Sequence, residues 1–334
     1  ARVLGIPELP HLFFVEGGAL AVENALKVAF DWKSRLNESR GLDPALGGRI
    51  LHLEHAFHGR SGYTMSLTNT DPIKVARFPT FDWPRIPSPY LRGGADMDAL
   101  EARSLAAART AFEQFPDDIA AAIVEPIQGE GGDHHFRPSF LLGLQALCHE
   151  FDALFVVDEV QSGAGITGTA WAHQQLGIEP DVLAFGKKTQ VCGIMAGRRV
   201  DMVRDNVFEV GSRINSTWGG GLADMVRARR ILEVIERDDL IARAAERGAV
   251  LGDALDALAV RHPSISDVRG RGLFRAFSLP DTATRDRLIT RLLVDERVIM
   301  LGCGSRSVRF RPALTVTEAA LADAVAAIDR VLSA

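Results

Sequence analysis

Three short apolar runs, each followed by polar residues, constrain the fold of this chain most. The runs cover residues 121–124, 154–157 and 182–185, and they end in Glu125-Pro126, Asp158-Glu159 and Gly186-Lys187. Uninterrupted apolar runs of this length are typical of parallel strands that are buried on both faces. Ligands of such sheets bind beyond the carboxyl ends of the strands. The sequence therefore predicts one crevice in which a carboxylate at one strand end meets the lysine amine at another.

Strands alternate with helical patterns over the first two thirds of the chain. We expect a helix at 19–35 and strands at 13–15, 50–53, 119–125, 154–158 and 182–185. This alternation predicts an α/β fold with a doubly wound, mostly parallel sheet. The pattern changes near residue 225, so two domains are expected, at 1–225 and 226–334.

The expected second domain is smaller and of the α+β type. From Met225 a helical pattern runs toward His262, and Asp238-Asp239 is a candidate break. Further strands are expected at 268–278, 298–301 and 308–310, and further helices at 282–296 and 317–332.

Composition excludes several classes of function. With 334 residues, of which 47% are hydrophobic, the chain can bury a large core. Its net charge of −5 predicts no nucleic-acid surface. The sequence shows neither a signal-peptide pattern nor an apolar run long enough for a membrane span, so we expect a cytoplasmic protein. Three scattered cysteines suit neither a disulfide scaffold nor a zinc site, although Cys192 follows Lys187 closely.

Lys187 and Asp158 together indicate a particular chemistry. An amine in the crevice can form an imine, and a nearby carboxylate can keep a pyridine nitrogen protonated, which are the two needs of pyridoxal 5'-phosphate. Each residue alone has a simpler explanation, since a lysine after a glycine is usually in a surface turn and an aspartate at a strand end is often a helix cap. Their combination with the motifs below favours the cofactor.

Two glycine-containing segments are candidates for a phosphate site. Gly17-Gly18-Ala19 lies between an expected strand and an expected helix, where backbone N–H groups and the helix dipole attract anions. It lacks the GxGxxG and Walker patterns. The second candidate is the segment 215–221, Asn-Ser-Thr-Trp-Gly-Gly-Gly.

Two further motifs remain. Pro126 and the glycines that follow it are expected to turn the chain and direct Glu130 into the crevice. His52, His55 and His58 lie three residues apart, but a strand followed by a loop would not hold three converging ligands, so no metal site is expected.

These motifs resemble the class III (omega) family of pyridoxal-phosphate aminotransferases, from about Phe13 to the last helix. The resemblance implies a fold-type I structure and a homodimer with shared active sites. It also implies that Lys187 binds the cofactor covalently and then transfers protons as a general acid and base. Asp158 then holds the pyridine nitrogen, Gln161 binds the side of the phenolic oxygen, and Phe57 packs on the ring.

The resemblance also assigns the phosphate and the substrates. The backbone at Gly18 and Ala19 is expected to bind the phosphate, and Thr217 is expected to reach the phosphate of the neighbouring subunit. The substrate residues are expected to be Arg60, Glu130, Gln161, Asn215 and Arg309. Arg60 would anchor a carboxylate, unless it only makes a surface salt bridge. Glu130 would mask Arg309 while the amino donor is bound, and Arg311, on the same face of its strand, is the alternative to Arg309.

Two departures from the common family pattern favour a branch that acts on lysine. Residues 163–168 read Gly-Ala-Gly-Ile-Thr-Gly, without the usual arginine, and residues 186–193 read Gly-Lys-Lys-Thr-Gln-Val-Cys-Gly. The expected reaction is transfer of the ε-amino group of L-lysine to 2-oxoglutarate. Enzymes of the ornithine, GABA or acetylornithine type are the alternatives. Only sixteen residues precede Gly17, fewer than the family normally has, so a truncated, non-catalytic chain is a further alternative.

Overall fold

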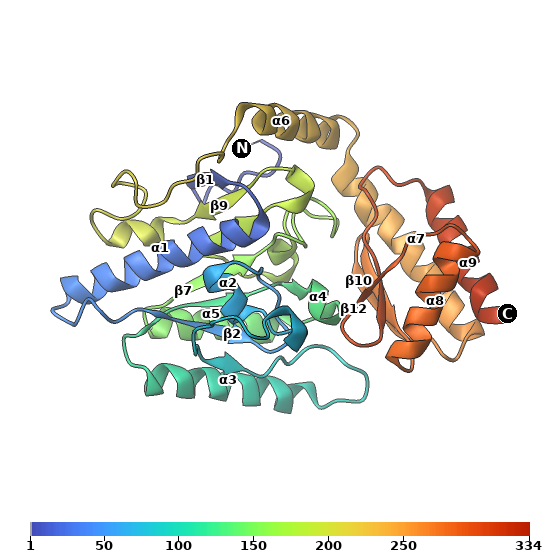
Figure 1. Ribbon diagram of the computed structural model, residues 1–334, viewed down its shortest axis with the longest axis horizontal. Helices are drawn as coiled ribbons and strands as arrows, with labels where there is room; N and C mark the ends of the chain where they lie inside the picture. Colours follow the sequence, from blue (N-terminus) through green and yellow to red (C-terminus); the bar gives the residue numbers. More distant parts are fainter. Residues whose placement is uncertain (1) are drawn as a thin grey trace.

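The computed structural model describes residues 2–334 and shows two lobes (Figure 1). A seven-stranded sheet with the order β1-β9-β8-β7-β4-β2-β3 organises the larger lobe. Its strands are β1 (His11–Val15), β2 (Arg49–Leu53), β3 (Arg85–Ile86), β4 (Ile119–Val124), β7 (Leu154–Asp158), β8 (Val182–Phe185) and β9 (Cys192–Ala196). Strands β8, β7, β4, β2 and β3 are parallel, whereas β9 is antiparallel to both β8 and β1. The sheet is therefore mostly parallel, as predicted, whereas the short strand β3 and the antiparallel strand β9 were not predicted from the sequence.

Helices cover both faces of this sheet. They are α1 (Gly18–Ser39), α2 (Gly62–Leu67), α3 (Met97–Gln114), α4 (Gly129–Gly132) and α5 (Pro138–Glu150), with short 3₁₀ turns at η1 (Pro72–Lys74), η2 (Ala172–Leu176), η3 (Lys187–Thr189) and η4 (Arg198–Met202). Alternate residues of β7 point to opposite faces: Val156 packs in the core under α1, and Val157 packs in the core under α3 and α5. This two-sided burial explains the uninterrupted apolar strands.

The smaller lobe contains a four-stranded antiparallel sheet with the order β10-β11-β13-β12. Its strands are β10 (Ser266–Arg271), β11 (Phe274–Ser278), β12 (Leu301–Cys303) and β13 (Ser307–Phe310), and its helices are α7 (Leu240–Arg261), α8 (Thr282–Val294) and α9 (Glu318–Ser333). The strand expected at 268–278 is a hairpin, because Gly272 turns the chain with φ of 53°. The strand expected at 298–301 lies later, at β12.

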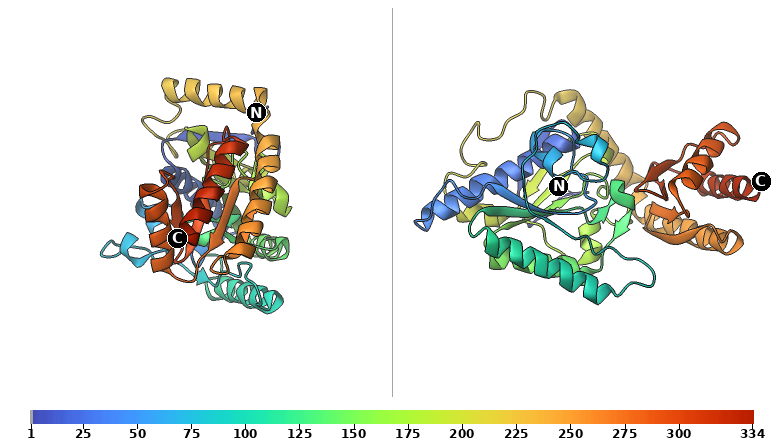
Figure 2. Two further views of the ribbon diagram at one scale, coloured as in Figure 1. Left: turned by 90° about the vertical axis from the view of Figure 1, so that its right-hand side faces the viewer. Right: turned by 60° about the horizontal axis from the view of Figure 1, so that its bottom comes forward.

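Helix α6 (Leu222–Arg237) connects the two lobes, and the chain breaks between α6 and α7 at Asp238-Asp239 as expected, with Asp239 at φ of 48°. The boundary predicted at residue 225 falls inside α6 and stays a prediction. Figure 2 shows the second lobe extending from one end of the first. A small ribbon of β5 (Ile127–Gln128) and β6 (His134–His135) lies on the side of the large lobe that faces it.

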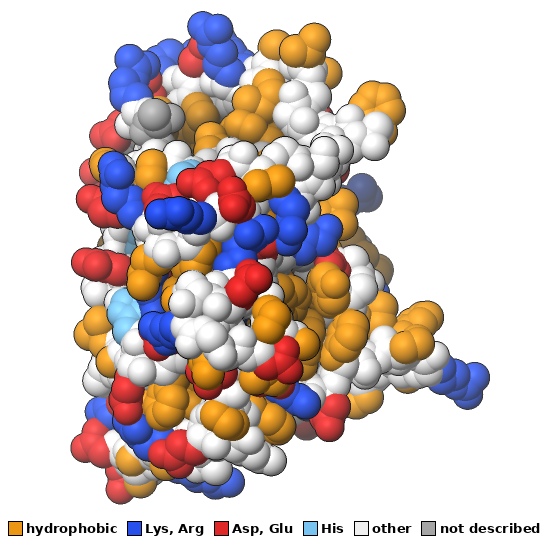
Figure 3. All heavy atoms as spheres, turned by 90° about the vertical axis from the view of Figure 1, so that its left-hand side faces the viewer, with side chains coloured by type: hydrophobic (Ala, Val, Ile, Leu, Met, Phe, Trp, Pro, Cys, Tyr) orange, Lys and Arg blue, Asp and Glu red, His pale blue; other side chains and the backbone are white. Residues whose placement is uncertain are grey.

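The face of the large lobe that is turned away from the small lobe carries charges of both signs mixed with hydrophobic side chains (Figure 3). Among residues 2–334, no helix is both long and apolar enough to cross a lipid bilayer.

Candidate active site

The carboxyl ends of β4, β7 and β8 meet at one edge of the large sheet, as the sequence predicts. Glu125 follows β4, Asp158 ends β7, and Gly186-Lys187 follows β8. Because the three strands are adjacent and parallel, their following residues are brought to the same edge. This edge of the sheet is the candidate active site.

Asp158 is held in a fixed orientation by two donors. His58 Nδ1 lies 2.8 Å from one carboxylate oxygen, and the Val160 N–H donates to the other at 3.0 Å. Both side chains of the His58–Asp158 pair are buried. His58, which the sequence offered only as a metal candidate, is therefore a partner of Asp158, and it leaves its Nε2 atom buried without a hydrogen bond.

Glu125 lies beside this pair and is fully buried. Its two oxygens accept the Phe57 N–H at 3.0 Å and the Gly129 N–H at 3.1 Å. Burial, opposed by the charge of His58 and assisted by the nearby Asp158, raises the pKa of Glu125 to about 7. Glu125 thus ties the loop that carries Phe57 to the start of α4, a role that was missed in the sequence because the residue was read only as the end of a strand.

The raised pKa of Glu125 predicts a pH dependence of stability. In the folded state Glu125 holds its proton up to about pH 7, whereas the unfolded state releases it near 4.5, so the folded state binds more protons between these values. Glu125 therefore lowers the free energy of unfolding as the pH rises from 4.5 to 7, by up to about 3 kcal/mol. Denaturant unfolding at several pH values should show that Glu125→Gln loses this part of the slope. An unchanged slope in the variant would contradict the assignment.

The start of α1 forms a cradle of free backbone donors. The first hydrogen bond of the helix joins Ala21 N–H to Gly17 O at 3.0 Å, which leaves the N–H groups of Gly18, Ala19 and Leu20 without helical acceptors. A Cβ on Gly18 would lie 2.6 Å from the Val160 side chain, two residues after Asp158. The predicted phosphate loop is therefore next to the end of β7.

Because neighbouring residues at a strand end face opposite sides, the sequence predicts that Lys187 faces the crevice and Lys188 points away from it. The structure shows a different backbone at this point. Both lysines lie in the 3₁₀ turn η3, and Lys187 has φ of 44°, which is uncommon for a residue with a side chain. Lys187 is exposed at the site edge, whereas Lys188 donates from Nζ to the Gln161 carbonyl at 2.5 Å. The reason given for Lys188 pointing away was wrong, because the strand ends before it. Burial, together with Arg311 and Lys187, lowers the pKa of Lys188 to about 7.

Glu130 and Arg309 form the ion pair that the resemblance implied. Arg309 Nη2 lies 3.1 Å from one oxygen of Glu130, and Lys74 Nζ lies 2.8 Å from the other. Although burial opposes it, the hydrogen bond from Lys74 and the charge of Arg309 lower the pKa of Glu130. Lys74 was not predicted, because it lies in the distant turn η1.

Two nitrogens of Arg309 lack hydrogen-bond partners among the described residues, whereas Arg311 lacks a partner only at Nε. The Nε and Nη1 atoms of Arg309 are buried without hydrogen-bond partners in the described structure. Arg311 pairs with the buried Asp133 and lies over the Phe274 ring. The contact with Glu130 therefore selects Arg309 rather than Arg311.

The remaining predicted residues lie around this edge. Gln161 packs against Gly129, where an added Cβ would lie 2.7 Å from its side-chain oxygen. Phe57 is half-buried, and the guanidinium carbon of the exposed Arg60 lies 5.9 Å from the centre of its ring. Within residues 2–334 Arg60 has no carboxylate partner, so its guanidinium is not used in a surface salt bridge.

The segment with Asn215 and Thr217 is exposed and lies beside the start of α1. Asn215 accepts the Ser216 N–H, and Ser216 donates to Glu16 at 2.5 Å. The structure thus places this segment next to Gly17 of the same chain. The expected contact of Thr217 with a neighbouring subunit stays a prediction.

His52, His55 and Cys192 make other contacts in the structure. In the part of the chain that the structure describes, no cluster of histidine, cysteine or acidic side chains is arranged to hold a metal ion. His52 is buried, and His55 packs edge-on against Tyr90. Cys192 is buried, and its sulfur would lie 2.6 Å from a Cβ on Gly186.

A comparison with protein families decides the identity of this fold. The model for aminotransferase class-III matches residues 2–332. The chain belongs to the class-III aminotransferases. Fold-type I, the α/β architecture and the use of pyridoxal phosphate follow from that membership.

Individual relatives refine the comparison. This class-III aminotransferase is 65% identical to an L-lysine-epsilon aminotransferase of Mycobacterium tuberculosis over 98% of its own length and 74% of the relative. It is 58% identical to an L-lysine-epsilon aminotransferase of Streptomyces clavuligerus, over 98% and 73%. A solved structure described as lysine aminotransferase from M. tuberculosis in the internal aldimine form superposes with a TM-score of 0.98 at 64% identity, covering all of this chain and 77% of that one.

The residues at the edge of the sheet fit pyridoxal phosphate. The cofactor needs an anion cradle, a carboxylate for its ring nitrogen and a lysine amine. The free N–H groups of α1, the fixed carboxylate of Asp158 and the amine of Lys187 are those three groups. The close contact of Gly18 with Val160 shows that the cradle leaves no room for a side chain.

Proposed function

We propose that this class-III aminotransferase transfers the ε-amino group of L-lysine to 2-oxoglutarate, giving 2-aminoadipate 6-semialdehyde and L-glutamate. The observation that carries the proposal is the Glu130–Arg309 pair at 3.1 Å. It covers Arg309, whose Nε and Nη1 atoms are buried without hydrogen-bond partners in the described structure. The M. tuberculosis and S. clavuligerus relatives named as L-lysine-epsilon aminotransferases, at 65% and 58% identity, support the choice of lysine.

The cofactor supplies an electron sink that stabilises negative charge on the carbon next to the reacting nitrogen. The chain supplies the rest. Asp158, fixed by His58, keeps the ring nitrogen protonated. The Lys187 amine would accept a proton from the substrate carbon and donate it again, as a general acid and base. Phe57, held by its backbone bond to Glu125, would pack against the cofactor ring.

Recognition of two different substrates is the second task of these residues. Lysine places its ε-amine at the reacting position, and its distant carboxylate is bound by Arg60, with Gln161 and Asn215 as further polar contacts. 2-Oxoglutarate carries a carboxylate next to its keto group, which needs an arginine close to the ring. We assign that contact to Arg309 after Glu130 has moved away, because a planar guanidinium binds both oxygens of a carboxylate.

An amino-donor screen with 2-oxoglutarate as acceptor tests the proposal. L-lysine should give the highest kcat/KM, and ornithine, 4-aminobutyrate and N-acetylornithine should be much slower. Formation of the semialdehyde is measured by its reaction with an aldehyde reagent. A clear preference for one of the other donors would replace lysine, and absence of turnover in a cofactor-loaded chain would favour a non-catalytic role.

We further propose that the chain works as a homodimer that shares its sites. The segment around Thr217 continues into exposed hydrophobic residues, with Trp218 73% exposed, Leu222 87% and Val226 70%. Exposed apolar groups of this size are typical of protein interfaces. They support a partner surface beside the predicted phosphate contact of Thr217.

Cofactor affinity should then depend on protein concentration. Dilution below the dimer dissociation constant is expected to release the cofactor, and Thr217→Val should weaken cofactor binding by about tenfold, through loss of one hydrogen bond to a charged phosphate worth about 1.5 kcal/mol. Sedimentation velocity with absorbance detection follows both quantities together. A fully loaded monomer would show that Thr217 acts within its own chain, beside Glu16.

A further inference from the structure

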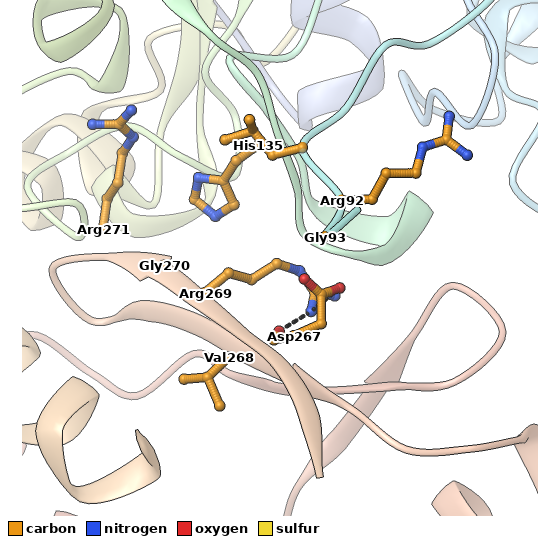
Figure 4. A pocket seen from close by; sticks show the side chains of 9 residues that line it. Arg92, Gly93, His135, Asp267, Val268, Arg269, Gly270 and Arg271 are labelled. Carbon is orange, nitrogen blue, oxygen red and sulfur yellow. Dashed lines mark hydrogen bonds and ion pairs between the residues drawn. The ribbon is translucent and has the colours of Figure 1, made fainter. Parts of the chain in front are cut away.

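A cavity of about 570 Å³ lies between the two lobes, apart from the residues of the candidate active site. The large lobe lines it with residues 91–93 and with His135 of β6. The small lobe lines it with residues 267–271 of β10. Figure 4 shows the two walls facing each other across the gap.

Positive charge dominates the lining of this interlobe cavity. Three arginines and one acidic residue line it: Arg92, Arg269, Arg271 and Asp267. Asp267 pairs with Arg269 at 3.1 Å. Arg269 also donates to the backbone oxygens of Gly132 and Asp133 in the large lobe, so it is a structural link between the lobes. Among the described residues neither Arg92 nor Arg271 has a carboxylate partner, although Arg92 lies over the Tyr90 ring, 4.4 Å from its centre.

Arg271 is a half-buried cation with one hydrogen-bond partner among the described residues. Its one hydrogen bond goes from Nη1 to the Gln175 side-chain oxygen at 3.2 Å, and within the described residues no carboxylate lies within 4 Å of it. Burial lowers the pKa of Arg271, which shows that its surroundings oppose the charge. An anion in the cavity would remove this cost.

His135 adds an unused polar atom to the same wall. Its side chain is almost fully buried, at 6% exposure, and its Nε2 atom has no hydrogen-bond partner in the described structure. In Figure 4 the ring points from β6 toward β10 across the cavity. Burial, followed by the charges of Arg271 and Arg269, lowers the pKa of His135 to about 3, so the ring is neutral at pH 7 and can donate one N–H. Buried polar atoms rarely remain unpaired.

We propose that the interlobe cavity binds a small dianion, either phosphate or a short dicarboxylate, through Arg271 and His135, with Arg92 at its edge. The planar guanidinium of Arg271 matches two oxygens of either anion. His135 supplies a donor from the opposite wall, so the bound anion contacts both lobes. Since Arg269 of the same strand bonds to Gly132 and Asp133, which follow Glu130 in the chain, the anion also holds the lobe contact next to the Glu130–Arg309 pair.

Calorimetric titration of the cofactor-loaded protein with inorganic phosphate and with malonate tests the proposal. Loading with cofactor occupies the phosphate cradle of α1, so that site does not contribute. We expect binding that weakens as sodium chloride is added, and that becomes at least tenfold weaker in Arg271→Gln. The control is Arg287→Gln on α8, which removes the same charge from an exposed position outside the cavity and should change the affinity less than twofold.

The comparison of phosphate with malonate shows which class of anion the interlobe cavity binds. Malonate can also bind at Arg309, so only binding that is lost in Arg271→Gln counts. Loss for phosphate alone assigns a phosphate site, loss for malonate alone assigns a dicarboxylate site, and loss for both assigns a general dianion site. The proposal is overturned if neither anion shows binding that depends on Arg271. If Arg271→Gln does not fold, Arg92→Gln replaces it, and an unchanged affinity in that exposed variant overturns the proposal equally.

Discussion

Lys187→Ala is expected to abolish the visible absorbance of the covalently bound cofactor and to lower kcat by about 10²–10⁴-fold through the loss of proton transfer alone. The expectation follows from the exposed position of Lys187 just beyond β8, at the edge that also holds Asp158. Absorbance spectra and single-turnover kinetics of the purified variant measure both effects.

Lys188→Ala is the matched control for this prediction. Lys188 has the lowered pKa, about 7, that favours imine formation, so chemistry alone would allow it to be the reacting amine. Its Nζ, however, donates to the Gln161 carbonyl, and the residue lines a separate cavity beside α6. We therefore expect the absorbance to remain in Lys188→Ala. Loss of the absorbance in Lys188→Ala, with its retention in Lys187→Ala, would exchange the two roles.

Glu130→Ala is expected to slow the half-reaction with lysine far more than the half-reaction with glutamate. Without Glu130, Arg309 is a buried cation that attracts the α-carboxylate of lysine and turns the substrate round. Breaking a buried ion pair costs about 3–5 kcal/mol, which corresponds to a factor of about 10²–10⁴ in the lysine half-reaction. Stopped-flow spectra of the two half-reactions measure the difference.

Lys74→Ala separates this effect from a general loss of charge balance. It removes the other partner of Glu130 but leaves the 3.1 Å contact with Arg309 in place. We expect its two half-reactions to change by similar, smaller factors. Equal slowing of both half-reactions in Glu130→Ala, or selective loss of the glutamate half-reaction, would rule out the masking role.

The sequence predicted the sheet edge well because local rules determine it. The strands β4, β7 and β8 end where apolar runs in the sequence are followed by polar residues. Glu125, Asp158 and Lys187 therefore lie at the same edge of the sheet. Strand β9 was missed because it is paired antiparallel at the far side of β8, and pairing partners are not encoded in apolar periodicity.

The supporting contacts were harder to predict. His58, Glu125 and Lys74 each act on a residue distant in the chain, at separations that no local pattern records. One sequence feature could have pointed to Glu125, namely its position as a polar residue directly after an apolar strand. For His58 the only such feature was its position directly after Phe57, the residue expected to pack on the cofactor ring. The alternation argument for Lys188 failed because the chain leaves the strand one residue earlier.

The contact of Lys74 with Glu130 has a consequence for how the enzyme alternates between its substrates. When Glu130 leaves Arg309, its carboxylate keeps Lys74 as a partner and is not left as a lone charge, and the incoming carboxylate of 2-oxoglutarate takes its place on Arg309. The two orientations of Glu130 can then be close in free energy. Because the two orientations have similar free energies, binding of the carboxylate of 2-oxoglutarate determines which one Glu130 adopts. Once glutamate has left, Glu130 pairs with Arg309 again and the pocket can accept lysine.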